Sequence, residues 1–114
     1  YPWLIEPHLN EIIDLLGFTK YNGLKRLLLK VLTFFPIPED REGELIDMCF
    51  TWLESPKEKV ALKVYSMQIL ADFCEKEQDI LPEFIAILEN NYEMNSMAFK
   101  SRADKVFKRF QNKI

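Results

Sequence analysis

Apolar residues recur at spacings of three and four along almost the whole chain, and clusters of Pro, Asn and Gly interrupt them. This is the period of an amphipathic helix, and no segment has the alternation that is typical of a strand. The pattern therefore predicts an all-α protein with six helices. They cover about residues 5–16, 22–35, 39–53, 56–76, 79–92 and 96–112.

The fourth helix has the clearest start signal and an unusual distribution of apolar residues. Ser55-Pro56-Lys57-Glu58 has the pattern of a capping box with Pro at the first helical position. The residues that follow form two apolar stripes on opposite sides of the helix, Val60, Val64, Met67, Ala71 and Cys74 on one and Leu62, Tyr65, Ile69 and Phe73 on the other. A helix that is apolar on two sides packs between neighbours, so we expect this one at the centre of the domain.

The even-numbered helices share one apolar spacing, i, i+4, i+7 and i+11. The aligned sets are Leu24/Leu28/Val31/Phe35, Val60/Val64/Met67/Ala71 and Phe99/Ala103/Val106/Phe110. In the second helix Leu27 and Leu32 extend the predicted buried stripe. Such a repeat is typical of stacked helical hairpins and predicts a solenoid of three hairpins whose second, fourth and sixth helices run parallel. An ordinary six-helix bundle is the alternative, because any amphipathic helix can show this spacing.

Three segments carry a resemblance to a known family. They are Cys49-Phe50-Thr51-Trp52-Leu53, residues 59–70 (KVALKVYSMQIL) and residues 98–103 (AFKSRA). Over about residues 41–112 the chain resembles a family of short HEAT-like helical-repeat proteins. The resemblance implies a right-handed α-α superhelix of the HEAT/armadillo type, here with three hairpins.

Some members of that family carry the label adenylosuccinate lyase. Such lyases use a signature loop rich in Ser, Met, Pro, Lys and Asn, together with a catalytic histidine and serine. A chain of 114 residues with one histidine has no counterpart of this machinery. We therefore do not expect lyase activity.

The length and composition indicate one globular domain over residues 1–114, with 48% hydrophobic residues and enough chain for a single core. Because the sequence begins at Tyr1 rather than Met, we expect a processed product or a cut fragment, such as the C-terminal part of a longer chain. Cys49 and Cys74 lie among apolar neighbours, which favours reduced thiols and a cytoplasmic location. No apolar run approaches the roughly 20 residues of a membrane span.

Few residues could carry chemistry. His8 is the single histidine, has no acidic or nucleophilic partner close in sequence, and excludes a multi-histidine metal site. Cys49 and Cys74 lie on apolar stripes rather than in the electropositive, partly exposed setting of a reactive cysteine. Three scattered glycines cannot form a phosphate-binding loop. We expect no enzyme activity, no cofactor and no metal.

Charge is distributed unevenly along the chain. Residues 15–38 carry a net charge of +4, residues 97–114 carry +5, and the rest carries −12. The candidate interaction residues are the bases of the second and sixth helices: Lys25, Arg26, Lys30, Lys100, Arg102, Lys105 and Arg109. Our first hypothesis is a module that binds another protein, and the second is a nucleic-acid-binding module that uses these bases. A third interpretation is that the lysines only solubilise exposed helix faces.

Overall fold

The computed structural model describes residues 2–113, and this part of the chain contains helices and turns but no strand. Six helices of ten or more residues are preceded by a short one, and three 3-10 turns lie between them. The elements are α1 (Pro2–Ile5), η1 (Glu6–His8), α2 (Leu9–Phe18), α3 (Asn22–Leu32), η2 (Glu39–Arg41), α4 (Glu42–Glu54), α5 (Val60–Cys74), η3 (Gln78–Ile80), α6 (Leu81–Asn91) and α7 (Met97–Arg109).

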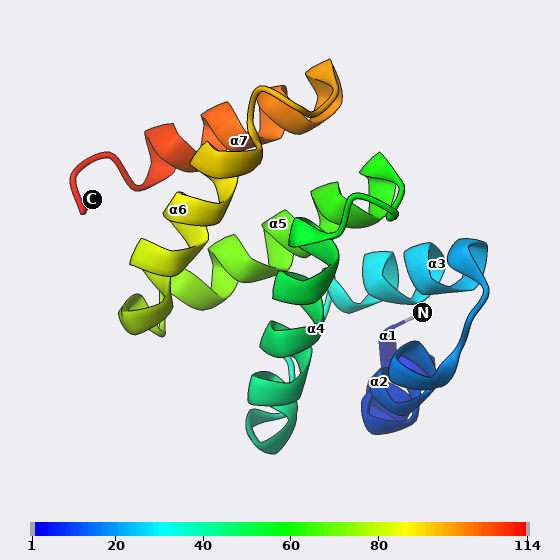
Figure 1. Ribbon diagram of the computed structural model, residues 1–114. Helices are drawn as coiled ribbons and strands as arrows, with labels where there is room; N and C mark the ends of the chain where they lie inside the picture. The colour runs from blue at the N-terminus through cyan, green and yellow to red at the C-terminus, as the bar shows by residue number, and fades with distance from the viewer. Residues whose placement is uncertain (1, 114) are drawn as a thin grey trace.

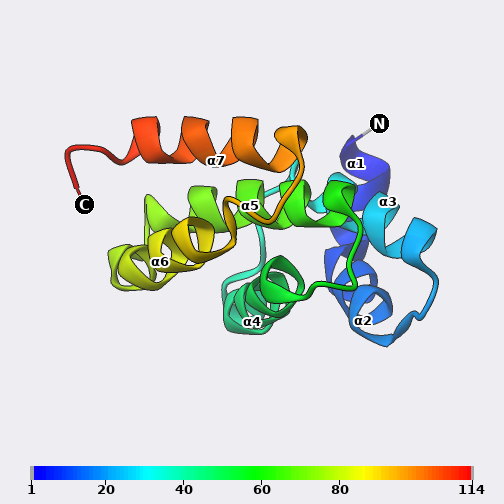
Figure 2. The ribbon, with the colours of Figure 1, turned by 45° about the horizontal axis from the view of Figure 1, so that its top comes forward.

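The six longer helices form three consecutive hairpins that stack in two layers. Hairpin 1 is α2–α3, hairpin 2 is α4–α5 and hairpin 3 is α6–α7 (Figure 1). Figure 2 shows α3, α5 and α7 in one layer and α2, α4 and α6 in the other. In both views α3, α5 and α7 run in the same direction. The predicted all-helical array of hairpins is confirmed, and the alternative of an ordinary bundle is not observed.

Helix α5 occupies the centre of the array. It packs against α3, α4 and α7, so it contacts both flanking hairpins as well as its own partner helix. Its buried residues are Leu62, Lys63, Ser66, Met67, Ile69, Leu70, Ala71, Phe73 and Cys74. The two buried polar side chains are paired, since Ser66 Oγ donates to the Leu62 carbonyl at 2.8 Å and Lys63 Nζ donates to Asn95 Oδ1 at 3.3 Å. The central position predicted for this helix is confirmed.

The predicted buried stripes agree with the structure best at the C-terminal end. All four predicted positions of α7 are buried. In α5 Val60 is 38% exposed, because it lies at the first residue of the helix beside the open end of the hairpin. In α3 the buried residues are Leu29 and Leu32, whereas Leu27, predicted to be buried, is 56% exposed. The predicted stripe is thus right for Leu32 and for the half-buried residues Leu24, Leu28, Val31 and Phe35. It wrongly includes Leu27 and omits Leu29, because apolar residues lie on several sides of this helix.

The capping box predicted at Ser55 is wrong. Ser55 directly follows the end of α4, its Oγ accepts a hydrogen bond from the Lys57 amide at 3.3 Å, and α5 begins only at Val60. The hydroxyl closes a local turn two residues ahead, a conformation that competes with N-capping. At Ser96, by contrast, Oγ accepts from the Phe99 amide at 3.4 Å and caps α7.

Two further helix boundaries differ from the prediction for reasons of backbone hydrogen bonding. Helix α3 ends at Leu32 rather than at residue 35, because the Phe34 and Phe35 amides bond to carbonyls three residues back, which tightens the chain before Pro36. The first predicted helix is divided into α1, η1 and α2 around Pro7, which has no amide hydrogen to donate.

Two arginines connect neighbouring hairpins. Arg41 pairs with Asp14 of α2 and with Glu44 of α4, and its Nη1 also donates to the Asn10 carbonyl at 3.2 Å. Arg109 of α7 pairs with two carboxylates of hairpin 2. Exposed ion pairs add little stability. We therefore infer that these contacts align the hairpins and contribute little to the free energy of folding.

We expect Met67→Ala to lower the free energy of unfolding by about 2–5 kcal/mol, because it removes most of a side chain from the centre of the core. Met67 is 1% exposed. Met97→Ala is the matched control, since Met97 is 76% exposed and its truncation removes no buried contact. Urea denaturation of both variants measures the effect. An unchanged midpoint for Met67→Ala would contradict the burial of α5.

The two serines give a second test of the helix starts. Loss of a true N-cap costs about 0.5–2 kcal/mol, so we expect Ser96→Ala to destabilise the protein by an amount in this range and Ser55→Ala by less. Thermal or urea unfolding of the two variants, compared with the parent, gives the difference. A larger loss of stability for Ser55→Ala than for Ser96→Ala would show that Ser55 is the N-cap of α5.

Candidate interaction surface

The layer of α3, α5 and α7 presents basic side chains on both sides of α5. We call this surface the α3–α5–α7 face, and it consists of Arg26 and Lys30 on α3, Val64 and Gln68 on α5, and Arg102 and Lys105 on α7. All four basic side chains are exposed, and Val64 and Gln68 are half-buried. The face therefore has a neutral centre with positive edges.

A cavity of about 100 Å³ lies between α5 and α7 on this face. Its apolar lining comes from Val64, Met67, Ala71 and Val106. Gln68 and the basic residues Arg102, Lys105 and Arg109 complete the lining. The spacing of α7 explains the arrangement, because Arg102, Lys105 and Arg109 recur at i, i+3 and i+7 beside the buried row that begins at Phe99.

A wider groove of about 450 Å³ lies on the other side of α5, between the first turns of α3 and α5. Arg26 lines it from α3, and Lys59, Val60 and Ala61 line it from the start of α5. Arg26 is thus placed across α5 from Arg102 and Lys105. Lys59, which is not among the predicted interaction residues, adds a base to this edge, and Glu58, which also lines the groove, is paired with Lys25.

Three of the seven candidate residues already hold partners within the chain. Lys25 Nζ lies 3.6 Å from Glu58 Oε1 and 5.9 Å from the centroid of the Trp52 ring. Lys100 Nζ lies 3.8 Å from Glu93 Oε2. These lysines stabilise the hairpin ends.

Arg109 is the third engaged residue. Its Nη1 lies 3.2 Å from Asp72 Oδ1, and its Nε lies 3.0 Å from Glu75 Oε1. The hydrogen bond from Arg109 is the main reason that the pKa of Glu75 lies below its ordinary value. This cluster makes the C-terminal end of the face nearly neutral.

The other four candidates have no such partner. Among residues 2–113, no carboxylate lies within 4.0 Å of the charged groups of Arg26, Lys30, Arg102 or Lys105. Their charge is therefore available to an external anion. The sequence placed all seven bases in one set, and the structure divides that set into three engaged and four unpaired side chains.

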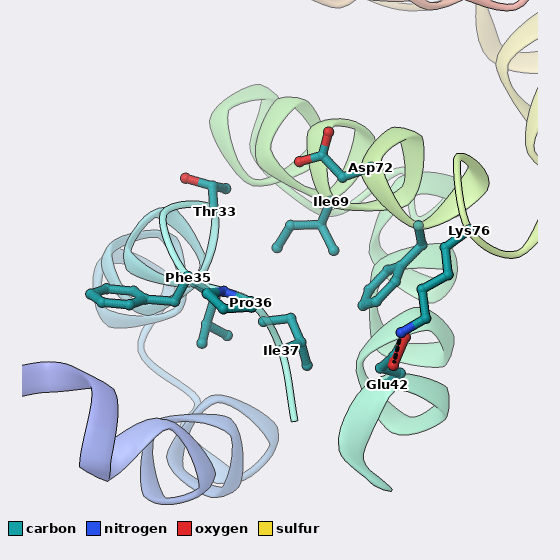
Figure 3. A pocket seen from close by; sticks show the side chains of 10 residues that line it. Thr33, Phe35, Pro36, Ile37, Glu42, Ile69, Asp72 and Lys76 are labelled. Carbon is teal, nitrogen blue, oxygen red and sulfur yellow. Dashed lines mark hydrogen bonds and ion pairs between the residues drawn. The ribbon is translucent and has the colours of Figure 1, made fainter. Parts of the chain in front are cut away.

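A third cavity, of about 240 Å³, opens beside the last turns of α3 and α5 (Figure 3). Apolar residues form most of its lining, and Glu42 is the buried polar group at its edge. Glu42 Oε1 accepts a hydrogen bond from Lys76 Nζ at 2.6 Å, and this bond raises the pKa of Lys76. The pair neutralises the buried carboxylate and ties α4 to the end of α5, so we assign it a structural role.

The groups that could act as nucleophiles or bases are inert or isolated. Burial raises the pKa of the Cys49 thiol to about 12 and that of Cys74 to about 11, so neither forms a thiolate near neutral pH. His8 is exposed, and its Nδ1 lies 3.1 Å from Glu11 Oε1, so the expectation that it has no acidic partner close in sequence is wrong. Within the described residues no three His, Cys, Asp or Glu side chains converge in a way that could hold a metal ion.

Comparison with known proteins agrees with this architecture. A family model described as HEAT repeat domain matches residues 1–110. The chain belongs to the HEAT repeat family. HEAT repeats generally serve as scaffolds for protein interactions. Neither the comparison with curated proteins nor the comparison with solved structures gives a match. No helix within residues 2–113 of this HEAT repeat protein is long and apolar enough to cross a bilayer.

The burial of both thiols makes a direct prediction. We expect Ellman's reagent at pH 8 to leave Cys49 and Cys74 unmodified in the folded protein, because the thiolate is scarce and the sulfur atoms are enclosed. In concentrated urea both should react completely, which is the control for reagent activity. Reaction of a folded thiol at the rate of free cysteine would show that one of these sites is open and activated.

Proposed function

We propose that this HEAT repeat protein is a non-enzymatic, cytoplasmic scaffold that binds an acidic segment of a partner protein on its α3–α5–α7 face. The observation that carries the proposal is the placement of exposed, unpaired bases on both sides of α5. Arg26 lines the groove on one side, with Lys30 one turn further along α3, and Arg102 and Lys105 line the cavity on the other. The free thiols of Cys49 and Cys74 support a reducing compartment.

The centre of the face suits a peptide better than a phosphate backbone. Val64 and Gln68 offer a half-buried, uncharged row on which side chains of a bound segment can pack. The basic edges then favour carboxylates on both sides of that segment and exclude basic partners. A stacked helical array supplies such an extended surface through its repeated helices.

Nucleic acid is the alternative partner, and the internal ion pairs weigh against it. Tight non-specific binding uses many phosphate contacts, each made by a free Lys or Arg. Lys25, Lys100 and Arg109 already hold carboxylates, and the whole chain has a net charge of −3. Four unpaired bases can neutralise only a few phosphates, which favours a protein partner over nucleic acid.

A charge reversal on α7 tests the proposal. We expect the double change Arg102→Glu and Lys105→Glu to weaken binding of a fluorescent, glutamate-rich peptide by about tenfold or more, because attraction becomes repulsion at one edge of the face. Lys108→Glu is the matched control on the same helix, since Lys108 lines a different groove with Ile85 and Phe107. Fluorescence anisotropy measures both. Equal affinity for parent and double variant would contradict the proposed face.

The same titration distinguishes the two partner classes. We expect a labelled oligonucleotide to bind weakly, and the double variant to retain the stability of the parent within about 0.5 kcal/mol, as is usual for surface substitutions. Micromolar oligonucleotide binding that falls steeply with salt and is lost in the double variant would instead favour the nucleic-acid module.

A further inference from the structure

A second surface, on the outer side of hairpin 1, is apolar although it faces solvent. We call it the N-terminal apolar face, and it consists of Leu15, Phe18, Tyr21, Leu24, Leu27 and Phe34. Phe18 is 84% exposed, Tyr21 77% and Phe34 74%. A groove of about 590 Å³, lined by Leu15, Phe18, Thr19, Lys20, Tyr21 and Leu24, hollows one end of this face.

The exposed aromatic residues are held in place rather than carried on a loose loop. Thr19 is 9% exposed, and its Oγ1 accepts a hydrogen bond from the Tyr21 amide at 3.2 Å. The Thr19 amide donates to the Leu15 carbonyl at 2.9 Å, which continues the hydrogen bonding of α2 up to the turn. A surface that is ordered before binding loses little conformational entropy on binding.

The position of this face in the array explains why it is uncovered. Leu29 and Leu32 are the buried residues of α3, which packs against α5, whereas Leu27 and Phe34 lie seven residues apart on the solvent side. At the other end of the array, most exposed residues of α7 are polar, among them Ser101, Asp104, Lys105 and Lys108, although a groove there is lined by Ile85 and Phe107. The outer side of hairpin 1 carries the larger set of exposed aromatic side chains, as expected of an interface.

Charge around the N-terminal apolar face selects the kind of partner. Lys20 lines its groove, and Lys30 lies one turn after Leu27 on α3 and four residues before Phe34, which follows the end of that helix. Residues 15–38 contain four bases and no acid, and the acids Glu11 and Asp14, one turn before Leu15 and Phe18 on α2, pair with His8 and Arg41. A partner that fits must offer an apolar stripe with carboxylates beside it.

A second copy of this chain does not meet that requirement. Face-to-face association would bring Lys20 and Lys30 of both copies together. Head-to-tail association would place them against hairpin 3, where residues 97–114 contain six bases and one acid and the groove of Ile85 and Phe107 holds Glu89 beside Lys108. Like charges thus meet face to face and bases predominate on the last helix, which disfavours self-association.

We propose that the N-terminal apolar face binds an acidic amphipathic helix of a partner protein. Apolar side chains at i, i+3 or i+4 and i+7 of that helix would pack on Leu24, Leu27 and Phe34, and one would enter the groove beside Phe18. Flanking Asp or Glu residues would pair with Lys20 and Lys30. This is the helix-in-groove mode of recognition; it shares Lys30 with the α3–α5–α7 face but does not use Arg102 or Lys105.

The test uses two synthetic helical peptides that share one Leu/Phe stripe and differ only in having Glu or Lys beside it. We expect the Glu peptide to bind the parent protein and the Lys peptide to bind at least about tenfold more weakly. Leu27→Glu should abolish binding of the Glu peptide. Met97→Glu is the matched control, because Met97 is an exposed apolar residue on hairpin 3. Fluorescence anisotropy measures affinity, and circular dichroism of each variant verifies folding.

A charge swap makes the test independent of the apolar substitution. The double variant Lys20→Glu/Lys30→Glu should no longer bind the Glu peptide and should bind the Lys peptide instead. The double variant Arg102→Glu/Lys105→Glu should bind both peptides with the affinities of the parent protein. The latter comparison separates failure of this inference from failure of the proposed scaffold face.

Four results would overturn the inference. They are equal binding of both peptides, binding of neither peptide, dimerisation of the parent in analytical ultracentrifugation that Leu27→Glu removes, and sedimentation with phosphatidylserine vesicles that Leu27→Glu removes. The last two would assign the N-terminal apolar face to a second copy of the chain and to an anionic membrane surface, respectively.

Discussion

The fold depends on the removal of α5 from water around most of its circumference. A helix buried in this way needs neighbours on several sides, and α3, α4 and α7 supply them. It also needs partners for every polar group it carries inward, which Ser66 and Lys63 find in the Leu62 carbonyl and Asn95. The three neighbouring helices have only one side against α5. Helix α2 covers part of α3 and α6 covers part of α4, and the sides that remain exposed carry charged or apolar side chains. Both candidate interaction surfaces follow from this division.

The fold class and the central helix could be predicted from apolar spacing, because a helix that is buried on two sides carries two apolar stripes in its sequence. The orientation of α3 could not be predicted in the same way. Leu27 and Leu29 are chemically equivalent, and only the position of α5 decides which of them is buried. The first residue of α5 could not be predicted from the local sequence either, because the Ser55 hydroxyl can close a turn or cap a helix and the sequence is compatible with both.

For the α3–α5–α7 face, the basic residues could be predicted from the sequence, but which of them pair with a carboxylate could not. Arg109 lies 37 positions from Asp72 and 34 from Glu75, and nothing in the local pattern links them. The pairing of Lys25 with Glu58 depends likewise on the contact between hairpins 1 and 2. Long-range ion pairs decide which charges remain free, and helix periodicity contains no information about them. The exposed state of Phe18 and Phe34 was equally hidden, since apolar residues are expected inside.

The sparse core of hairpin 1 has a consequence for cooperativity. Helix α2 buries three side chains and α3 buries two, whereas α5 alone buries nine. Gly17 lies in the last turn of α2 and Gly23 in the first turn of α3, and glycine has a lower helix propensity than alanine. In a linear array, the unit with the smallest share of core is expected to open first, so we expect hairpin 1 to open before hairpins 2 and 3. Any molecule that covers its outer side also shifts this local opening equilibrium, and part of its binding energy appears as protection of the backbone amides of α2 and α3.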